Sequence, residues 1–267
     1  MAGTSSLDAE QIAVPACHDE APDEEKRRKG DLQWEIEVST RWGSILKDEP
    51  ECQSEQIGNR EVWVVDGLFT EEECNGLLEA SEQHGFGTTN YPKSYRGNLR
   101  LITTDPSMSD VVWKRLKPHV PAVLHLNGEP WEAVGLNECW RLAKYYPGDR
   151  FCGHCDACFE RTDSEVSMLT VNIYMNGGFL GGRTRFYQRD RKRVDFAVEP
   201  QAGRCLLFRQ PPGEKYFHDG EALASGTKYL FRSDVMYARR SKAAGETNAA
   251  SKEPRASPTQ EAVDLML

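Results

Sequence analysis

Short β-forming segments separated by turns fill the second half of the chain, and this rhythm constrains the fold most. The expected strands are Glu138–Tyr146, Phe151–Asp156, Val166–Met175, Arg183–Tyr187, Val194–Val198, Cys205–Phe208, Tyr216–His218 and Lys228–Tyr237. Glycine and proline punctuate them, as at Pro147-Gly148 and Gly181-Gly182. About eight short strands in this rhythm predict a sandwich or a jelly roll.

Two helices and two further strands are expected ahead of this series. Thr70 and Glu73 have the spacing of a capping box, which predicts a helix running to about His84. Asp105-Pro106 opens a second helix with Val112, Leu116 and Val120 on one face. The strands are expected at Val62–Val65 and Leu99–Thr103. We therefore expect a mainly β fold with flanking helices that pack on one sheet.

Charge divides the chain into a core and two flanks. The formal net charge is -9, yet residues 58–240 contain 24 basic and 24 acidic residues. The flanks carry the whole acidic excess and few large apolar groups, which is typical of disorder. We expect a largely disordered N-terminal region over 1–57, a folded domain over 58–240 and a disordered tail over 241–267. Whether residues 32–57 pack on the core stays open, because 32–42 fits an edge strand or an appended helix.

The chain shows no pattern that predicts export or a membrane partner. No apolar run is long enough to cross a bilayer, and residues 1–10 lack the pattern of a signal peptide. Eight scattered cysteines fit free thiols in a reducing compartment. We expect an intracellular, cytoplasmic protein. The basic run Lys26–Lys29 leaves the nucleus open, although a solvated stretch is the favoured interpretation.

A candidate metal site lies on the predicted strands. His154 and Asp156 are two residues apart, so on a strand both would face the same side. His218, well downstream, is the natural third ligand. Two histidines and one carboxylate suit an Fe(II) oxygenase, because they leave neighbouring coordination positions open for a 2-oxo acid and O2. Lys228 lies ten residues beyond His218 and is placed to pair with a distal carboxylate, although a solvated strand edge is the plainer interpretation.

Several motifs in order resemble the prolyl-4-hydroxylase-like 2-oxoglutarate oxygenases. They are residues 145–156 around His154-Cys155-Asp156, then 170–176, 179–186, 198–203 and 206–208, His218, and 226–237, preceded by a family-like opening helix at 69–74. The likeness spans about Val62 to Arg239. One departure is Arg183, where the family often has an acidic residue; three cysteines close to the metal motif are another.

The resemblance implies a double-stranded β-helix (a cupin-like jelly roll) and an Fe(II)- and 2-oxoglutarate-dependent dioxygenase. It implies that His154, Asp156 and His218 bind iron, and that Lys228 binds the distal carboxylate of 2-oxoglutarate. Tyr145, with Thr170 or Tyr174, would contact the cosubstrate. O2 is the second cosubstrate, and ascorbate is a candidate additional cofactor. A prolyl residue of a protein is the leading candidate substrate.

Three alternatives stay open. Cys152, Cys155 and Cys158 are spaced like part of a zinc-binding module, although a second matching pair is absent. A catalytically silent binding protein on the same fold is another interpretation. Small molecules and nucleic acid remain candidate substrates, because the basic segment Arg189–Arg193 lies near Arg183 and Arg185, although a solvated turn is favoured. The oligomeric state cannot be predicted.

Overall fold

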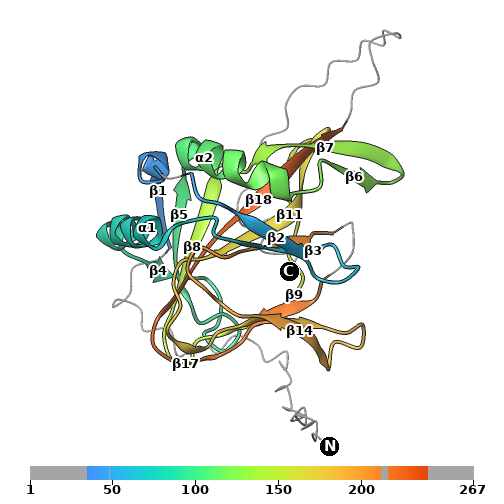
Figure 1. Ribbon diagram of the computed structural model, residues 1–267. Coiled ribbons are helices and arrows are strands. Elements are labelled where there is room, and N and C mark those ends of the chain that lie inside the picture. The colour runs from blue at the N-terminus through green and yellow to red at the C-terminus, as the bar shows by residue number, and fades with distance from the viewer. Residues whose placement is uncertain (1–34, 48, 212–215, 240–267) are drawn as a thin grey trace, which may run out of the picture.

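Eight strands of the chain are wound into two facing sheets. The computed structural model describes residues 35–47, 49–211 and 216–239. Four of the strands are central to the major sheet in the order β8 (Cys139–Tyr145), β18 (Lys228–Arg239), β11 (Glu165–Tyr174) and β15 (Cys205–Arg209). The minor sheet has the order β14 (Val194–Val198), β13 (Thr184–Tyr187), β16 (His218–Gly220) and β9 (Phe151–His154). The fold is a double-stranded β-helix, and all eight expected strands are present (Figure 1).

Shorter strands extend the major sheet on both sides. On the β8 side lie β5 (Leu99–Thr104), β4 (Gly87–Thr88) and β1 (Ile36–Ser39), and on the β15 side lie β3 (Val62–Asp66) and β2 (Gln53–Gln56). The hairpin β6 (Val123–Leu126) and β7 (Glu129–Leu136) pairs with β18, and β10 (Glu160–Thr162) pairs with β11. A separate small pair is formed by β12 (Leu180–Gly181) and β17 (Leu223–Ser225).

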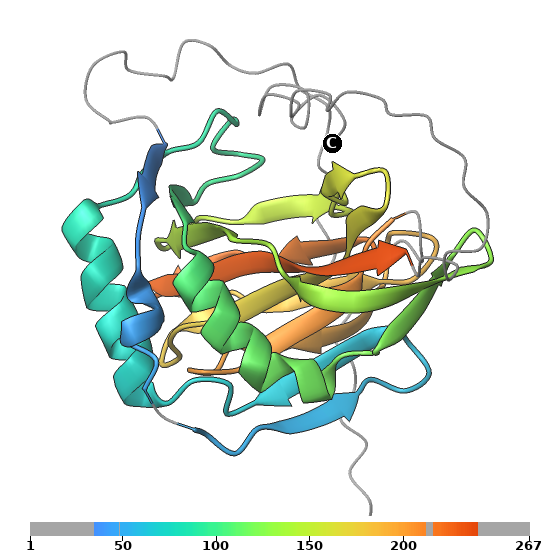
Figure 2. The same ribbon diagram turned by 90° about the horizontal axis from the view of Figure 1, so that it is seen from above.

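Two helices cover the outer face of the major sheet, as expected. Figure 2 shows α1 (Glu71–His84) and α2 (Pro106–Leu116) side by side on this face. The capping box of Thr70 and Glu73 is present at the start of α1. Fully buried Leu77 of α1 and Val112 of α2 belong to the same apolar core as Leu142 and Phe231 of the sheet. This packing removes the outer face from water and leaves the inner face to form the site.

The sequence left open whether residues 32–57 pack on the core, and the described part of this segment does so. β1 pairs in parallel with β5, and a 3-10 helix, η2 (Trp42–Ser44), follows it and contacts α2. Trp42 is buried, and its backbone N–H donates to the Asp105 carboxylate at 2.5 Å. The domain therefore includes residues from 35 onward, and 36–39 is an edge strand. The expected disorder of 1–30 and 241–267 and the basic run 26–29 lie outside the described residues.

Smaller differences have local causes. The second helix ends at Leu116 and is followed by a 3-10 turn, η3 (Lys117–His119), so Val120 is buried but not helical. Pro118 explains this end, because it has no backbone N–H with which to continue the α-helical hydrogen bonds; Lys117 before it keeps helical backbone angles and begins the 3-10 turn. His218 begins its strand instead of ending one. No helix within the described ranges is long and apolar enough to cross a membrane.

Candidate metal centre

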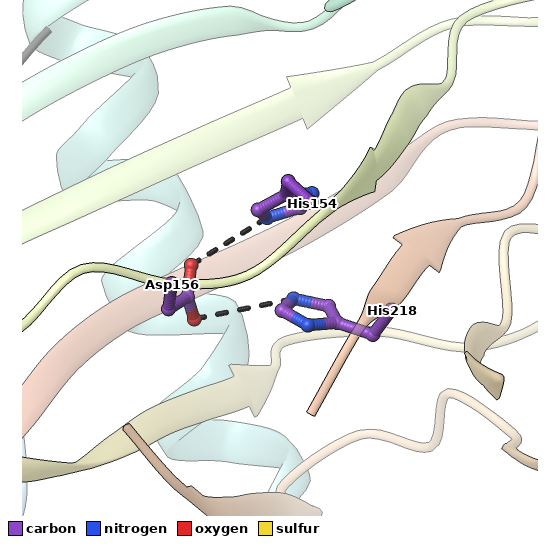
Figure 3. Close-up of side chains that lie close together, drawn as sticks. All are labelled: His154, Asp156 and His218. Carbon is purple, nitrogen blue, oxygen red and sulfur yellow. Dashed lines mark ion pairs between the residues drawn. The ribbon is translucent and has the colours of Figure 1, made fainter. Parts of the chain in front are cut away.

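Three side chains converge at the inner face of the minor sheet. One potential ligand atom from each of His154, Asp156 and His218 lies within 4.8 Å of the others, and all three residues are buried. The Asp156 oxygens lie 3.5 Å from Nε2 of His154 and 3.9 Å from Nε2 of His218 (Figure 3). The sequence prediction that these three residues meet is thus matched by their placement.

Strand register brings the two histidines together. β9 and β16 are antiparallel neighbours, and His154 is directly opposite His218 in their register. Asp156 lies two residues beyond the end of β9, in an irregular segment (Figure 3). The two-residue alternation therefore correctly predicted that Asp156 faces the same side as His154, although the strand itself ends at His154.

Both imidazoles present the same nitrogen to the site. Nδ1 of His154 lies 2.8 Å from the Cys152 carbonyl, and Nδ1 of His218 lies 2.9 Å from the Tyr216 carbonyl. A carbonyl only accepts, so each Nδ1 carries the hydrogen that it donates. Nε2 is then left with a free lone pair, which is the form that coordinates a metal.

The charge states also suit a metal. Burial lowers the pKa of His218 to about 4, which keeps its imidazole neutral. Burial acts to raise the pKa of Asp156, but the Arg232 guanidinium and the two imidazoles outweigh it and hold that pKa well below its usual range. Two imidazoles and one carboxylate are the donor set that suits Fe(II). The residues present therefore fit this metal.

A network of hydrogen bonds fixes the carboxylate of Asp156. The Thr170 hydroxyl donates to Asp156 Oδ2 at 2.7 Å and accepts from Gln210 Nε2 at 3.0 Å. The same Gln210 nitrogen donates to Asp234 Oδ1 at 2.7 Å, and Ser167 donates to the Gln210 carbonyl oxygen at 2.6 Å. Such partners orient a metal-binding carboxylate before the metal arrives. Gln210, which directly follows β15, was not singled out from the sequence.

A cavity of about 50 Å³ adjoins the three side chains. Lys228 lines it and is 3% exposed, so the solvated strand edge considered from the sequence is wrong. Its Nζ donates to the Gly182 carbonyl at 2.6 Å. Burial lowers the pKa of Lys228 to about 8, against the opposing effect of Glu221 and Asp219. Lys228 is therefore a buried cation at the wall of the cavity.

The three expected cosubstrate contacts are placed differently from one another. Tyr145 lines the cavity, and its ring centre lies 5.2 Å from Lys228 Nζ. Tyr174 is fully buried, donates its hydroxyl to Thr184 Oγ1 at 2.6 Å and does not line the cavity. Thr170 does not line it either, because its hydroxyl is turned to Asp156. Thr170 therefore contacts one of the three converging side chains, Asp156, whereas Tyr174 bonds to Thr184.

The cysteines do not assemble a zinc site. Within the part of the chain that the structure describes, His154, Asp156 and His218 are the only group of three or more potential metal-ligating residues. Cys152, Cys155 and Cys158 form no disulfide among the described residues, and Cys152 Sγ donates to the Ser94 carbonyl at 3.4 Å. The zinc-module interpretation is therefore wrong for the described residues.

Arg183 and Arg185, which follow the paired glycines, form ion pairs with nearby carboxylates. Arg183 makes two hydrogen bonds to the Glu221 carboxylate, each 2.7 Å, and Arg185 makes two to Asp219 at 2.9 and 2.6 Å. In the exposed tip Arg189–Arg193, Asp190 accepts from the backbone of Lys192 and Arg193. These contacts fit the solvated turn that the sequence analysis favoured.

Comparison with known proteins gives one family match. Residues 140–233 match the model of the 2OG-Fe(II) oxygenase superfamily. No curated protein matches the chain. This stretch begins in β8 and ends in β18, so it contains the other six wound strands whole, parts of these two, and all three converging side chains.

Solved structures with a similar fold include three prolyl hydroxylases. A viral collagen prolyl hydroxylase from Paramecium Bursaria Chlorella virus-1 is 20% identical, with a TM-score of 0.47 over 67% of this chain and 97% of that one. A Pseudomonas putida prolyl-4-hydroxylase is 17% identical, with a TM-score of 0.49 over 68% of this chain and 94% of that one. A Trichoplax adhaerens prolyl hydroxylase, in complex with a hypoxia inducible factor peptide, is 15% identical. Its TM-score is 0.45 over 66% of this chain and 84% of that one.

The family match and the fold agree with each other. A double-stranded β-helix with a His-Asp-His group beside a cavity is what a 2-oxoglutarate oxygenase requires, and Fe(II), 2-oxoglutarate and O2 are the cofactor and cosubstrates of this superfamily. The match is confined to residues 140–233, and over this stretch the chain is similar to the 2OG-Fe(II) oxygenase superfamily.

Proposed function

We propose that His154, Asp156 and His218 hold Fe(II), that Lys228 binds the distal carboxylate of 2-oxoglutarate, and that the enzyme hydroxylates a C–H bond. The observation that carries the proposal is the meeting of two imidazoles and one ionised carboxylate beside a cavity walled by a buried lysine. Bound Fe(II) would supply the redox chemistry that couples O2 and 2-oxoglutarate to hydroxylation, with succinate and CO2 as coproducts.

The chain's own residues have three tasks in this proposal. Thr170 and Gln210 orient the Asp156 carboxylate, and the backbone carbonyls of Cys152 and Tyr216 keep both imidazoles in the coordinating tautomer. Lys228, held by the Gly182 carbonyl and set between aromatic rings, offers one positive charge to the cosubstrate. Phe151, stacked on His154 at 3.8 Å between ring centres, limits access of water.

The leading candidate substrate is a prolyl residue of a protein or peptide. It is supported by the order and spacing of the motifs from Tyr145 to Tyr237, which resemble prolyl-4-hydroxylase-like oxygenases. A small molecule is the second candidate, because the cavity beside the three side chains is small and closely walled.

Anaerobic titration tests the cofactor assignment. Adding Fe(II) and then 2-oxoglutarate to the full chain should produce a visible charge-transfer band, and admission of O2 should release succinate. Candidate peptides and metabolites are then examined by mass spectrometry for the gain of one oxygen atom that requires iron, O2 and 2-oxoglutarate. Failure to bind stoichiometric Fe(II) at the three side chains would refute the proposal.

A further inference from the structure

Cations outnumber carboxylates around the cavity. Four arginines line it together with Lys228, and we call them the arginine cluster: Arg96, Arg100, Arg141 and Arg232. The carboxylates that line it are Asp156 and Asp219. Asp219 already makes two hydrogen bonds to Arg185, so it does not neutralise the cluster.

The cluster lies on the side of the cavity away from Lys228. In the major sheet Arg141 is opposite Arg232, and Arg100 is opposite Ala143, which is in turn opposite Leu230. Arg232 is four residues from Lys228 along β18, about 13 Å at about 3.3 Å per residue. Arg232 also lies 3.2 Å from Asp156 Oδ1, so the cluster surrounds the end of the cavity where the three converging side chains meet.

Only part of the cluster is neutralised. Arg100 pairs with Glu35 at 2.7 Å, while Arg141 and Arg232 share Asp234 at 3.4 and 3.6 Å. The buried Nε atoms of Arg100 and Arg232 have no hydrogen-bond partner within the described structure.

Arg96 has the least compensation. Its Nε donates to the Asn98 side chain at 3.1 Å, and within the described residues no carboxylate forms an ion pair with it. The guanidinium is held against the rings of Phe151 and Tyr91, at 4.4 and 5.6 Å from their centres. These contacts fix its orientation and leave its two terminal nitrogens available.

Iron and 2-oxoglutarate would not remove this excess. The charge of Fe(II) is matched by Asp156 and the proximal carboxylate of the cosubstrate, and Lys228 is matched by the distal carboxylate. Asp234 then serves two arginines, and among the described residues no carboxylate pairs with the half-buried Arg96. A cation partly withdrawn from water gains from an anionic partner, and a planar guanidinium favours bidentate contact with a carboxylate.

We infer that the substrate to be hydroxylated carries a carboxylate, which binds the arginine cluster through Arg96 beside the metal centre. This inference rests on the proposed function and names the substrate class of the same site. The carboxylate is either an acidic side chain next to the reacting residue of a peptide or part of a free small acid. A cluster in this position would hold the reacting C–H bond near the metal by anchoring its anionic neighbour.

Binding to the full chain, loaded with Mn(II) and the unreactive 2-oxoglutarate analogue N-oxalylglycine, tests the inference without turnover. The first arm compares capped proline-containing peptides that differ only by Glu or Gln beside the proline. The second compares small carboxylic acids with their amides. Calorimetry should show about tenfold tighter binding of the acid in one arm, equivalent to about 1.4 kcal/mol, and that arm identifies the source of the carboxylate.

The Arg96→Gln variant should abolish this preference and leave the affinity for N-oxalylglycine within about twofold, a difference too small to signal a lost ion pair. Arg150→Gln is the matched control, because Arg150 packs on the same loop through the Ser94 carbonyl and does not line the cavity. Should Arg96→Gln fail to fold, Arg96→Lys keeps the charge without the planar fork and should retain only part of the preference.

The inference would be overturned if neither arm showed a preference for the acid, or if Arg96→Gln and Arg150→Gln had equal effects. Loss of N-oxalylglycine binding in Arg96→Gln would also overturn it, because the cluster would then bind the cosubstrate. Failure of the unaltered protein to bind Mn(II) and N-oxalylglycine would instead refute the proposed function.

Discussion

Asp156 is held on both of its oxygens by neighbours with different roles. Thr170 donates to Oδ2, while the Arg232 guanidinium lies 3.2 Å from Oδ1. The hydroxyl fixes the orientation of the carboxylate, and the guanidinium keeps it ionised. A metal that binds Asp156 must share the carboxylate with Arg232, so the affinity of the site depends on residues beyond the three proposed ligands.

Replacing any of the three proposed ligands should abolish metal binding. His154→Ala, Asp156→Ala and His218→Ala each remove one donor, so stoichiometric Fe(II) binding and succinate formation should both be lost. The fold should remain, because these side chains line the cavity and belong to none of the apolar clusters. Metal content and circular dichroism measure the two effects. His125→Ala, at an exposed position of β6, is the control; full turnover in a ligand variant would contradict the assignment.

Thr170→Val tests the orienting role of the hydroxyl. The change keeps the side-chain shape and removes the hydrogen bond to Asp156, so metal affinity should fall by about 10- to 100-fold. Competition with a metal-sensitive dye measures this, and Thr162→Val on exposed β10 should have no effect. Direct contact of Thr170 with 2-oxoglutarate would appear differently, as a weaker cosubstrate affinity at unchanged metal affinity.

Lys228 should make 2-oxoglutarate binding depend on pH. Burial lowers its pKa to about 8, and only the protonated amine attracts a carboxylate. Affinity should therefore be highest below pH 8 and fall above it, by up to about tenfold for each further pH unit. Anaerobic titrations at three pH values measure the trend. Lys228→Arg should remove it, since the guanidinium stays charged, and a flat profile for the unaltered protein would move the role to another cation.

Among the elements, the segment before β2 packs on the core in a way that the sequence left open. Trp42 of η2 packs in the apolar core, and its ring lies 5.8 Å from that of His84. Its backbone N–H and the Thr40 hydroxyl both donate to Asp105 Oδ2, while Oδ1 of the same carboxylate accepts from the Met108 N–H at the start of α2. One carboxylate thus joins the N-terminal segment to the helix.

Trp42→Ala should destabilise the protein strongly. Removing a buried indole leaves a cavity, and the free energy of unfolding should fall by about 3–5 kcal/mol. Chemical denaturation measures the loss. Ser44→Ala, at an exposed position of the same 3-10 helix, is the control. Equal stability of the two variants would mean that the N-terminal segment does not contribute to the core.

The elements that could be predicted from the sequence are those with local signals at both ends. Several of the eight wound strands are bounded by Gly and Pro turns, and α1 begins at a capping box. The β6–β7 hairpin was missed although its turn, Asn127-Gly128, has two positive φ angles of 53° and 80°. That dipeptide is a strong hairpin signal, so the local sequence does specify this hairpin.

The remaining features depend on register, which no local pattern reveals. Lys228 and Arg232 share one face of β18 by alternation, but their distance from Asp156 is set by the pairing of β18 with β11 and β8. The position of Gln210 depends in the same way on β15. The proposed ligands His154 and Asp156 could be predicted because their motif is short and local, and His218 followed from the resemblance of the later motifs, whereas the arginine cluster has no such signal.

At the scale of the whole molecule, the major sheet separates two environments. The two helices lie on its outer face (Figures 1 and 2) and form the large apolar core with it. Its inner face and the minor sheet enclose a smaller aromatic core and the polar cavity. The inner face carries ionisable groups that the apolar core could not accommodate. Stability and chemistry are therefore assigned largely to opposite faces of one sheet.

This division implies that a shorter chain keeps both properties. Every residue buried in the apolar clusters lies between Trp42 and Tyr237, and the ion pairs of the arginine cluster reach no further than Glu35. We predict that residues 35–239 alone fold with an unchanged Tm and bind Fe(II) with the affinity of the full chain. Calorimetry and metal titration compare the two. A chain starting at residue 58 is the contrasting variant and should be destabilised, because it lacks β1, Trp42 and the partner of Arg100. Equal Tm values for the chains that start at 35 and 58 would contradict the domain boundary derived from the fold.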